Sequence, residues 1–492
     1  MPSAPLPRTT PSAQGVDARG VVAFVDALER VPRLEPHSLM VLRHGHVVAE
    51  GWWAPYAPDR LHLLYSLSKT FTACALGLAV AEGRLGLDDT VISHFPELDG
   101  EITDPRTRRI RVRHLAAMAS GHRVEQLDAA LATDPKNLVR GFLLNPPDAE
   151  PGTVFAYSQP CTYTLAAILG RLTGESLTGY LRPRLLDPLG IGPVAWVRDA
   201  SGQELGYSGL HATTEDIARI GQLHLQRGSW EGRQLLPASW VEQATSRQVD
   251  NTGVMDNPDW QRGYGFQFWM QRHGYRGDGA FGQFCLVLPE QDAVVALTAA
   301  AEDMQAVLDA AWAHLVPALG GRTETQRPAE GVAGDAGADA DAALVARLTG
   351  LVLPRAAGGA RPPAATAEAW GRFVGRSPQT PLTVAVHGAG DAWHVRVDTP
   401  DADGTPLSLD LPLSLDGWQE AAPPTEPDGV PLPLATSAAW ADVDTLRVDV
   451  VLVETPHRLL LTCHLAAGTV TMEWHTTPLW NGPLHEQRAP LA

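Results

Sequence analysis

The stretch Tyr65-Ser66-Leu67-Ser68-Lys69 begins an apolar segment that runs to Glu82, and it decides how the whole chain is interpreted. Apolar side chains recur in this segment at the spacing of a helix: Phe71, Ala75, Leu78 and Ala79. Residues at i and i+3 share one helical face, so Oγ of Ser66 and Nζ of Lys69 can come within hydrogen-bond reach. Ser66 would lie in the first turn, where free backbone N–H groups favour a developing oxyanion.

Lysine is nearly absent from this chain. Of the 38 basic residues only Lys69 and Lys136 are lysines, and all the others are arginines. Arginine can take over structural roles of lysine, but it cannot lose its proton near neutral pH. A desolvated lysine with a lowered pKa can take the proton of a serine and so activate it. From the spacing alone, a Ser-x-x-Lys motif is more often an N-cap serine followed by a surface lysine than a catalytic pair. The scarcity of lysine favours a base at Lys69, whereas Lys136 lies in a polar stretch and is interpreted as a surface residue.

Length and charge narrow the classes of function. The 492 residues carry 38 basic and 56 acidic side chains, a formal net charge of −18. The length predicts more than one domain. An acidic surface repels phosphate backbones and anionic lipids, so neither nucleic acid nor a membrane is expected as a partner. There is no apolar run of about 18 residues and no signal-peptide pattern, so a cytoplasmic location is expected. The four cysteines lie far apart and are expected to be reduced thiols.

The order of helical and strand patterns predicts the domains. Residues 18–319 have strand patterns at both ends, beginning with Ser38–Glu50, around a mostly helical middle. This predicts an α/β (α+β) domain, with an antiparallel sheet flanked by helices and a mostly helical second lobe. Residues 1–17 are expected to be flexible, and the Gly-, Ala-, Pro- and acid-rich residues 320–365 to form a linker. Residues 366–492 predict a small antiparallel β-domain, for which a lipocalin-like barrel is one candidate form.

Sequence patterns of several other chemistries are missing. The chain has no phosphate-binding Gly-x-x-x-x-Gly-Lys loop, no His-Glu-x-x-His and no Gly-x-Ser-x-Gly. His44 and His46 alternate in a strand-like segment without a nearby carboxylate, and solvated strand histidines explain them better than a metal site. We therefore expect neither a metal nor a cofactor.

Further motifs follow the Ser-x-x-Lys stretch in a fixed order. They are Ala81-Glu82-Gly83-Arg84-Leu85-Gly86-Leu87-Asp88-Asp89, Arg111-Val112-Arg113-His114-Leu115 with Ser120-Gly121-His122, Pro151-Gly152-Thr153-Val154-Phe155-Ala156-Tyr157-Ser158, Thr213-Thr214-Glu215-Asp216-Ile217-Ala218 and Gly263-Tyr264-Gly265-Phe266. From about Val21 to Leu319 the chain resembles the serine β-lactamase and penicillin-binding-protein-like family, in its class C and esterase branch. The ordered motifs are specific for the fold and less specific for the substrate.

The resemblance assigns roles to the first two motifs. It implies that Ser66 is the acylated nucleophile and that Lys69 is the base or a proton relay. The family's second motif is Tyr-x-Asn, and here it reads Tyr157-Ser158-Gln159. Tyr157 would shuttle protons, with a core aromatic residue as the structural alternative. Gln159 would stand where the family's asparagine binds the substrate amide, but its side chain is one methylene longer.

The third family motif departs from the pattern. Relatives place a lysine or histidine in a strand beside the site, and the matching region, residues 275–283, contains no lysine. Asp278 stands near the place of that cation and is followed by Gly279 and Ala280. By resemblance, the backbone N–H groups of Ser66 and of the residue near Ala280 would bind the oxyanion. A carboxylate at Asp278 would disfavour anionic substrates. The alternatives are that Gly-Asp-Gly is a tight turn and that Arg272 or Arg276 supplies the missing positive charge.

These observations predict a serine hydrolase that acts through a Ser66 acyl-enzyme. The expected substrate is a small-molecule or peptide-like ester or amide that is not an ordinary anionic β-lactam. The family also includes D-aminopeptidases, aminohexanoate-oligomer hydrolases, acyltransferases and peptide cyclases, so acyl transfer or cyclisation is an alternative. A catalytically silent binding protein on the same fold is the alternative from a different class.

Overall fold

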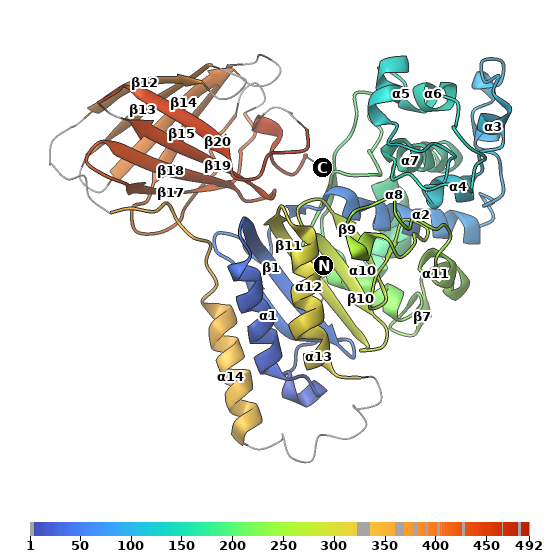
Figure 1. The fold of residues 1–492 in the computed structure, drawn as a ribbon, viewed down its shortest axis with the longest axis horizontal. Helices are drawn as coiled ribbons and strands as arrows, with labels where there is room; N and C mark the ends of the chain where they lie inside the picture. The colour runs from blue at the N-terminus through green and yellow to red at the C-terminus, as the bar shows by residue number, and fades with distance from the viewer. Residues whose placement is uncertain are drawn as a thin grey trace.

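The computed structural model describes residues 4–321, 335–359, 369–376, 381–389, 392–400, 404, 406–425, 429–464, 466–480 and 484–491. A six-stranded antiparallel sheet with the order β2-β1-β11-β10-β9-β8 lies at the centre of the N-terminal domain (Figure 1). Its strands are β1 (Leu34–Arg43), β2 (His46–Trp52), β8 (Trp269–Met270), β9 (Tyr275–Gly279), β10 (Gln283–Leu288) and β11 (Ala293–Ala301). Strand β1 pairs with β11 from Leu34↔Ala301 to Arg43↔Ala293, so the two ends of the domain meet in one sheet, as predicted.

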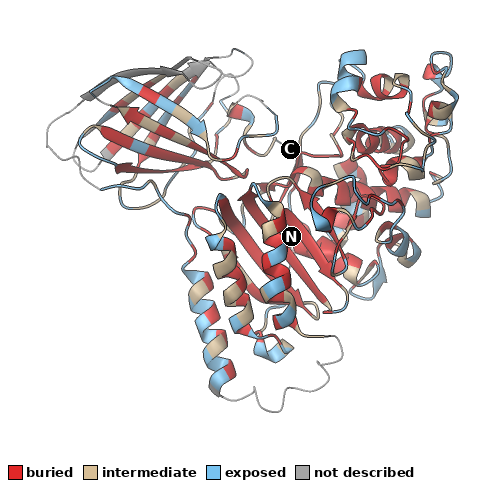
Figure 2. Cartoon of the chain, in the orientation of Figure 1, coloured by how far each residue is buried: buried red, intermediate tan, exposed pale blue. Residues whose placement is uncertain are grey.

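Helices cover both faces of this sheet, and every residue of β1 and β11 is therefore buried. Helix α1 (Ala18–Arg30) packs against β1, and α12 (Met304–Ala310) lies beside α1 (Figure 1). Helix α10 (Thr214–Leu225) packs against β1, β10 and β11. In α1 the buried side chains recur at helical spacing, which gives the helix one apolar face: Val21, Phe24, Val25 and Leu28. Figure 2 shows the buried strands between helices whose outer faces are exposed.

A helical lobe stands beside the sheet and contains α4 (Val112–Ala116), α5 (Leu127–Thr133), α6 (Leu138–Leu144), α7 (Gln159–Thr173) and α8 (Leu177–Leu181). Helix α2 (Ser68–Ala81) contacts α7 and α8 of this lobe and also strand β9. Since α2 has neighbours on all sides, it is buried from Ser68 to Ala79. No helix in the described part of the chain is long and apolar enough to cross a membrane.

Three segments differ from the predictions. Residues 38–50 were expected to be one strand, but the chain turns at His44-Gly45, where φ is 49° and 76°, and forms the β1–β2 hairpin. The described part of residues 1–17 is packed on the domain, because Leu6 is buried and Arg8 pairs with Glu50 and Glu215 at 3.0 and 2.7 Å. Within residues 320–365, helix α14 (Asp335–Thr349) packs against α1 and β2, although its composition indicated a linker.

The C-terminal domain contains two antiparallel sheets with a separate apolar core between them. The first has the order β12 (Ala369–Arg376), β13 (Pro381–Ala389), β14 (Ala392–Pro400) and β15 (Pro406–Leu413). The second has the order β16 (Gln419–Ala421), β17 (Leu434–Trp440), β18 (Thr445–Leu452), β19 (His457–His464) and β20 (Thr469–Trp474). Among the described residues no hydrogen-bonded ladder joins the two sheets into a closed barrel, so the small antiparallel domain is confirmed but a barrel is not observed.

Candidate active site

Ser66 lies on a tight turn directly before helix α2. Residues Tyr65–Leu67 form a single 3₁₀ turn, and Tyr65 has a φ of 47°, a conformation that non-glycine residues rarely adopt. The hydroxyl of Ser68 donates to the carbonyl of Tyr65 at 2.6 Å and accepts from the backbone N–H of Leu210 at 3.0 Å, which holds the turn in place. Unusual backbone of this kind clusters at functional sites. The turn presents the Ser66 hydroxyl at the N-terminal end of α2.

Lys69 is buried one turn further along, and its Nζ lies 3.0 Å from Oγ of Ser66. Nζ also donates to Oε1 of Gln159 at 2.7 Å and to the carbonyl of Tyr207 at 2.8 Å. Burial disfavours the charged ammonium and lowers the pKa of Lys69 to about 7, although the negative charges of Glu125 and Asp278 act in the opposite direction. An amine with this pKa can be neutral at physiological pH and accept the proton of Ser66.

The ring of Tyr157 lies next to the Lys69 ammonium group. The Tyr157 ring stacks on Trp269 with centroids 5.1 Å apart, and Nζ of Lys69 lies 4.7 Å from the centroid of the Tyr157 ring. Burial raises the pKa of Tyr157, while a hydrogen bond between its side chain and Ser66 has the opposite, smaller effect. Tyr157 therefore stays protonated near neutral pH and can donate a proton within reach of Ser66. The structure thus brings Ser66, Lys69 and Tyr157 together.

Gln159 is the first residue of helix α7, and its side chain holds the lysine. Since the amide oxygen of Gln159 is engaged by Lys69, its NH₂ group is left to donate a hydrogen bond into the cavity that Gln159 lines. The backbone N–H of Gln159 donates to both carboxylate oxygens of Glu125 at 3.1 Å. Glu125 therefore binds the N-terminus of α7, where a negative charge is favoured.

Asp278 is buried and paired with a neighbouring arginine. Its carboxylate accepts from Nε of Arg276 at 2.9 Å, and the two side chains are 7% and 0% exposed. The described residues that line the cavity around Ser66 do not include Asp278. The reason is that Arg276, two positions earlier on β9, lies on the same face of the strand and satisfies the carboxylate inside the protein. The Asp278 carboxylate is thus paired with Arg276 inside the protein, while its negative charge still acts on Lys69 and Tyr157, and its contact with a substrate stays a prediction.

Gly279 brings strand β9 close to the turn that carries Ser66. A Cβ atom at Gly279 would lie 2.1 Å from the carbonyl oxygen of Leu64 and 3.1 Å from the backbone N of Leu67. Only glycine allows this approach of two backbones. The next residue, Ala280, is half-buried at the end of β9 and starts the turn into β10. The backbone at Ala280 is therefore close in the chain to the point where β9 meets the Ser66 turn.

A cavity of about 980 Å³ opens at Ser66. Glu125, Asp128 and Asp199 supply carboxylates to its lining, and Lys136 lies at the same cavity. The aromatic residues Tyr65, Tyr163, Tyr207 and Trp480 and the apolar residue Leu479 also line it. Acidic groups therefore outnumber the single lysine among the described residues that line the cavity.

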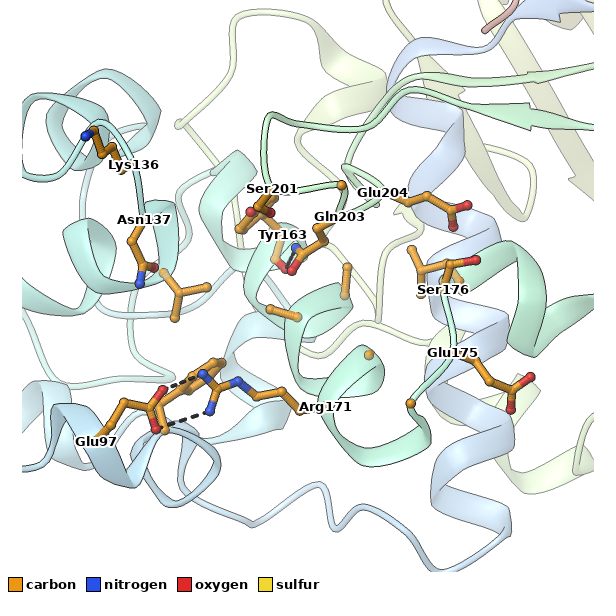
Figure 3. A pocket seen from close by; sticks show the side chains of 18 of the residues that line it. Glu97, Lys136, Asn137, Tyr163, Arg171, Glu175, Ser176, Ser201, Gln203 and Glu204 are labelled. Atoms are coloured by element: carbon orange, nitrogen blue, oxygen red, sulfur yellow. Dashed lines mark hydrogen bonds and ion pairs between the residues drawn. The ribbon is translucent and has the colours of Figure 1, made fainter. Parts of the chain in front are cut away.

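A second cavity, of about 530 Å³, adjoins the first, since Lys136, Tyr163 and Ser201 line both (Figure 3). On one side of it Arg171 forms an ion pair with Glu97, and Figure 3 shows Tyr163 between Asn137 and Gln203. The lining residues of this cavity do not include Ser66, which lines the larger cavity. The chemistry of the Ser-x-x-Lys pair therefore belongs to the larger cavity.

Sequence reasoning did not identify Glu125, Leu479 or Trp480. Glu125 follows the Ser120-Gly121-His122 motif by three residues, but nothing in the sequence indicates the direction of its side chain. Leu479 and Trp480 belong to the stretch Pro478-Leu479-Trp480-Asn481-Gly482-Pro483. In the sequence, a large aromatic residue flanked by Pro and Gly was a signal for a binding residue.

Comparison with known proteins agrees with this geometry. The family model for Beta-lactamase matches residues 37–319, which is more than half of the chain, and the chain belongs to this family. It is similar to the 6-aminohexanoate-dimer hydrolase of Paenarthrobacter ureafaciens, with 27% identity over 60% of this chain and 81% of that protein. It is also 27% identical to the esterase EstB of Burkholderia gladioli over 37% of this chain and 53% of EstB.

The solved structure of EstCE1, described as a hydrolase with promiscuous acyltransferase activity, has the same fold. The TM-score is 0.50 at 19% identity, and the match covers 61% of this chain and 99% of EstCE1. Together, the family and its similar members define the protein as a serine hydrolase. The matched region contains Ser66, Lys69 and Tyr157 and ends before the C-terminal β-domain.

Proposed function

We propose that this protein hydrolyses an ester or an amide through an acyl-enzyme formed on Ser66. The observation that carries the proposal is the pair of Ser66 and Lys69, with Nζ 3.0 Å from Oγ and a lysine pKa of about 7. A base is most effective when its pKa is near the working pH. Nearly all other cations of the chain are arginines, which cannot serve as this base.

Each proton has a donor and an acceptor in this arrangement. Oγ of Ser66 bonds to the carbonyl carbon while neutral Lys69 takes the hydroxyl proton, giving an oxyanion. The oxyanion then collapses, and the bond to the leaving alcohol or amine breaks. The leaving group takes a proton from the Tyr157 hydroxyl, and the protonated Lys69 gives its proton to the Tyr157 oxygen in turn. Water then attacks the acyl-enzyme with its proton accepted by Lys69, and Ser66 regains a proton as the acid leaves.

Two backbone N–H groups are proposed to bind the oxyanion, those of Ser66 and Ala280. The close approach of Gly279 to Leu64 and Leu67 supports this, because it fixes the end of β9 against the turn that carries Ser66. The position of Ser66 at the start of α2 adds the positive end of the helix dipole. A fixed donor of this kind commonly lowers the barrier of acyl transfer by about 2.7–4 kcal/mol.

The proposed substrate is neutral or cationic beside the scissile carbonyl. Glu125 lies next to Lys69, and Asp128 and Asp199 line the same cavity, so an anionic acyl donor would meet like charges. The relative named as a 6-aminohexanoate-dimer hydrolase is consistent with an amide whose chain carries an amine. A terminal ammonium group on such a substrate would be attracted by these carboxylates.

A fluorophosphonate probe tests the proposal directly, because it reacts only with an activated serine. Wild-type protein should be labelled at Ser66, and Ser66→Ala should not be labelled. Absence of labelling in correctly folded wild-type protein would favour the alternative that the fold serves as a silent binding protein.

Acyl transfer is the second candidate. It is favoured by the apolar side of the cavity, where Tyr207, Leu479 and Trp480 could hold an acceptor in place of water. The test is to add an alcohol during hydrolysis of a p-nitrophenyl ester and to measure the ratio of new ester to free acid. A ratio far above the molar ratio of alcohol to water would identify an acyltransferase.

A further inference from the structure

The C-terminal β-domain reaches the nucleophile turn at three points. The backbone N–H of Leu63 donates to the carbonyl of Glu454 at 2.8 Å. The Tyr65 hydroxyl lies 2.6 Å from Nε2 of His457. The rings of Tyr65 and Trp480 have centroids 6.0 Å apart. The residues directly before Ser66 are therefore in contact with a domain that the family match does not include.

Buried ion pairs and hydrogen bonds fix this domain in position. Arg458 donates to Glu35 at 2.6 Å, with side chains only 8% and 10% exposed, and to the carbonyl of Pro354 at 2.9 Å. The Tyr56 hydroxyl donates to the carbonyl of Thr455 at 2.9 Å. Separation of the two domains would leave the charges of this pair without their partners, so the interface holds the domains together.

His457 connects the nucleophile turn to the segment that carries Trp480. Its Nδ1 lies 2.9 Å from the carbonyl of Thr476, and a carbonyl can only accept, so Nδ1 carries the proton. Nε2 is then the acceptor and the Tyr65 hydroxyl is the donor. Burial lowers the pKa of His457 to about 4, so this neutral tautomer persists at physiological pH. Thr476 is buried four residues before Trp480.

Leu479 and Trp480 form an apolar wall of the Ser66 cavity. Both side chains line it, and both remain accessible, with 57% and 38% of their surface exposed. The Trp480 ring meets Tyr207 edge to face with centroids 6.2 Å apart, and the carbonyl of Tyr207 accepts from Lys69. A partly exposed indole between two tyrosines has no core to stabilise and is free to pack on a ligand.

We infer that the C-terminal domain completes the substrate site, and that Trp480 is a specificity-determining residue that selects acyl donors with a bulky apolar or aromatic group. This inference rests on the proposed function of Ser66. The apolar group would pack between Trp480 and Tyr207, while the scissile carbonyl lies at Ser66. His457 bonds to Tyr65 and to Thr476, and so links the turn that carries Ser66 to the segment that precedes the wall.

The experiment compares wild type with Trp480→Ala in the full chain. The substrates are p-nitrophenyl acetate, butyrate and octanoate, which vary the acyl group, and p-nitrophenyl and 2-naphthyl acetate, which vary the leaving group. We expect Trp480→Ala to lower the preference for the larger member of at least one series by about 10-fold, the scale expected when a large apolar contact is lost. The loss should appear mainly in KM, with labelling of Ser66 by a fluorophosphonate unchanged. Val443→Ala, which removes another exposed apolar side chain of the same domain, is the control and should leave every ratio unchanged.

The outcomes separate the two proposals. Retained labelling with size preferences that match wild type in both series would overturn the role of Trp480 and leave the role of Ser66 intact. Absence of labelling in wild type would overturn the proposed function and, with it, this inference. Since Trp480 is partly exposed, the variant should fold, and an unchanged melting temperature would verify this.

Discussion

The hydroxyl of Tyr65 lies 2.6 Å from Nε2 of His457, although 392 positions separate the two residues in the chain. Tyr65 is the residue directly before Ser66, the proposed nucleophile, and its φ of 47° sets the direction in which Ser66 leaves the turn. A second tyrosine, Tyr56, makes a comparable contact with the same domain through the carbonyl of Thr455. Tyr56 does not line the Ser66 cavity, so the two tyrosines form a matched pair.

Tyr65→Phe and Tyr56→Phe should have similar effects on stability and different effects on activity. Each removes one buried hydrogen bond and leaves a polar partner unsatisfied, at a cost of about 1–3 kcal/mol in the free energy of unfolding. Only Tyr65→Phe loosens the turn beside Ser66, and we expect kcat/KM to fall about 10-fold in that variant alone, since small misplacements of a reacting group are costly. Urea unfolding and ester hydrolysis measure the two effects. Equal losses of activity would contradict a special role for Tyr65.

The two lysines offer a second matched comparison. Lys69→Arg keeps the positive charge but removes the base, so acylation should slow by about 10²–10⁴-fold. Lys136→Arg should leave the rate within about 2-fold of wild type, because Lys136 is exposed at the edge of the cavity. Stopped-flow release of p-nitrophenol measures acylation. A Lys69→Arg variant with near wild-type acylation would rule out the proposed base.

The pH dependence of acylation should follow Lys69. Since only the neutral amine is a base, kcat/KM should rise with pH through a midpoint near 7 and then level off. The negative charge of Glu125 raises the pKa of Lys69, so Glu125→Gln should move this midpoint to a lower pH. A midpoint that stays in place in Glu125→Gln would show that the titrating group is not Lys69.

Glu125 should also select the charge of the substrate. Two unit charges about 4 Å apart interact by roughly 4 kcal/mol at an effective dielectric constant of 20, so removal of one carboxylate can change specificity. We expect Glu125→Gln to increase the ratio of kcat/KM for anionic nitrocefin to that for a neutral p-nitrophenyl ester. The control is Glu242→Gln, which removes an exposed carboxylate outside the cavity. An equal increase in the control would mean that only net charge matters.

Asp278 should matter for stability instead. Asp278→Asn leaves the guanidinium of Arg276 buried without its carboxylate, and loss of one partner of a buried pair costs about 3–5 kcal/mol. The melting temperature should therefore fall, while the ratio of nitrocefin to neutral-ester hydrolysis measured on folded protein stays unchanged. A changed ratio without a loss of stability would return Asp278 to the substrate site.

Local patterns in the sequence predicted most of the N-terminal fold. The apolar spacing of α2 predicted a helix, and the strand patterns at both ends of the domain predicted the sheet, because side-chain periodicity reflects which residues are buried. Turns were harder to predict. The turn at His44-Gly45 was missed, since a single glycine after a histidine also fits a continuous strand.

The Ser66–Lys69 pair could be predicted from the sequence, whereas the other residues around the cavity could not. Ser66 and Lys69 are three residues apart on one turn of chain, so helix geometry alone brings them together. Glu125 and Trp480 reach the same cavity from distant parts of the chain, and their positions depend on how separate elements pack. The ion pair of Asp278 with Arg276 could not be predicted from resemblance to a motif, because it depends on how the two side chains of β9 are buried.

The hydrogen bond from Leu63 to the carbonyl of Glu454 has an evolutionary consequence. A descendant gene that lost the C-terminal domain would leave a backbone donor and the Tyr65 hydroxyl uncovered beside its nucleophile. Surviving truncated enzymes would need a compensating insertion elsewhere, or a different residue at position 65. Among proteins that keep both domains, substitutions of Tyr65 and of His457, whose side chains make the neighbouring contact, should arise in pairs.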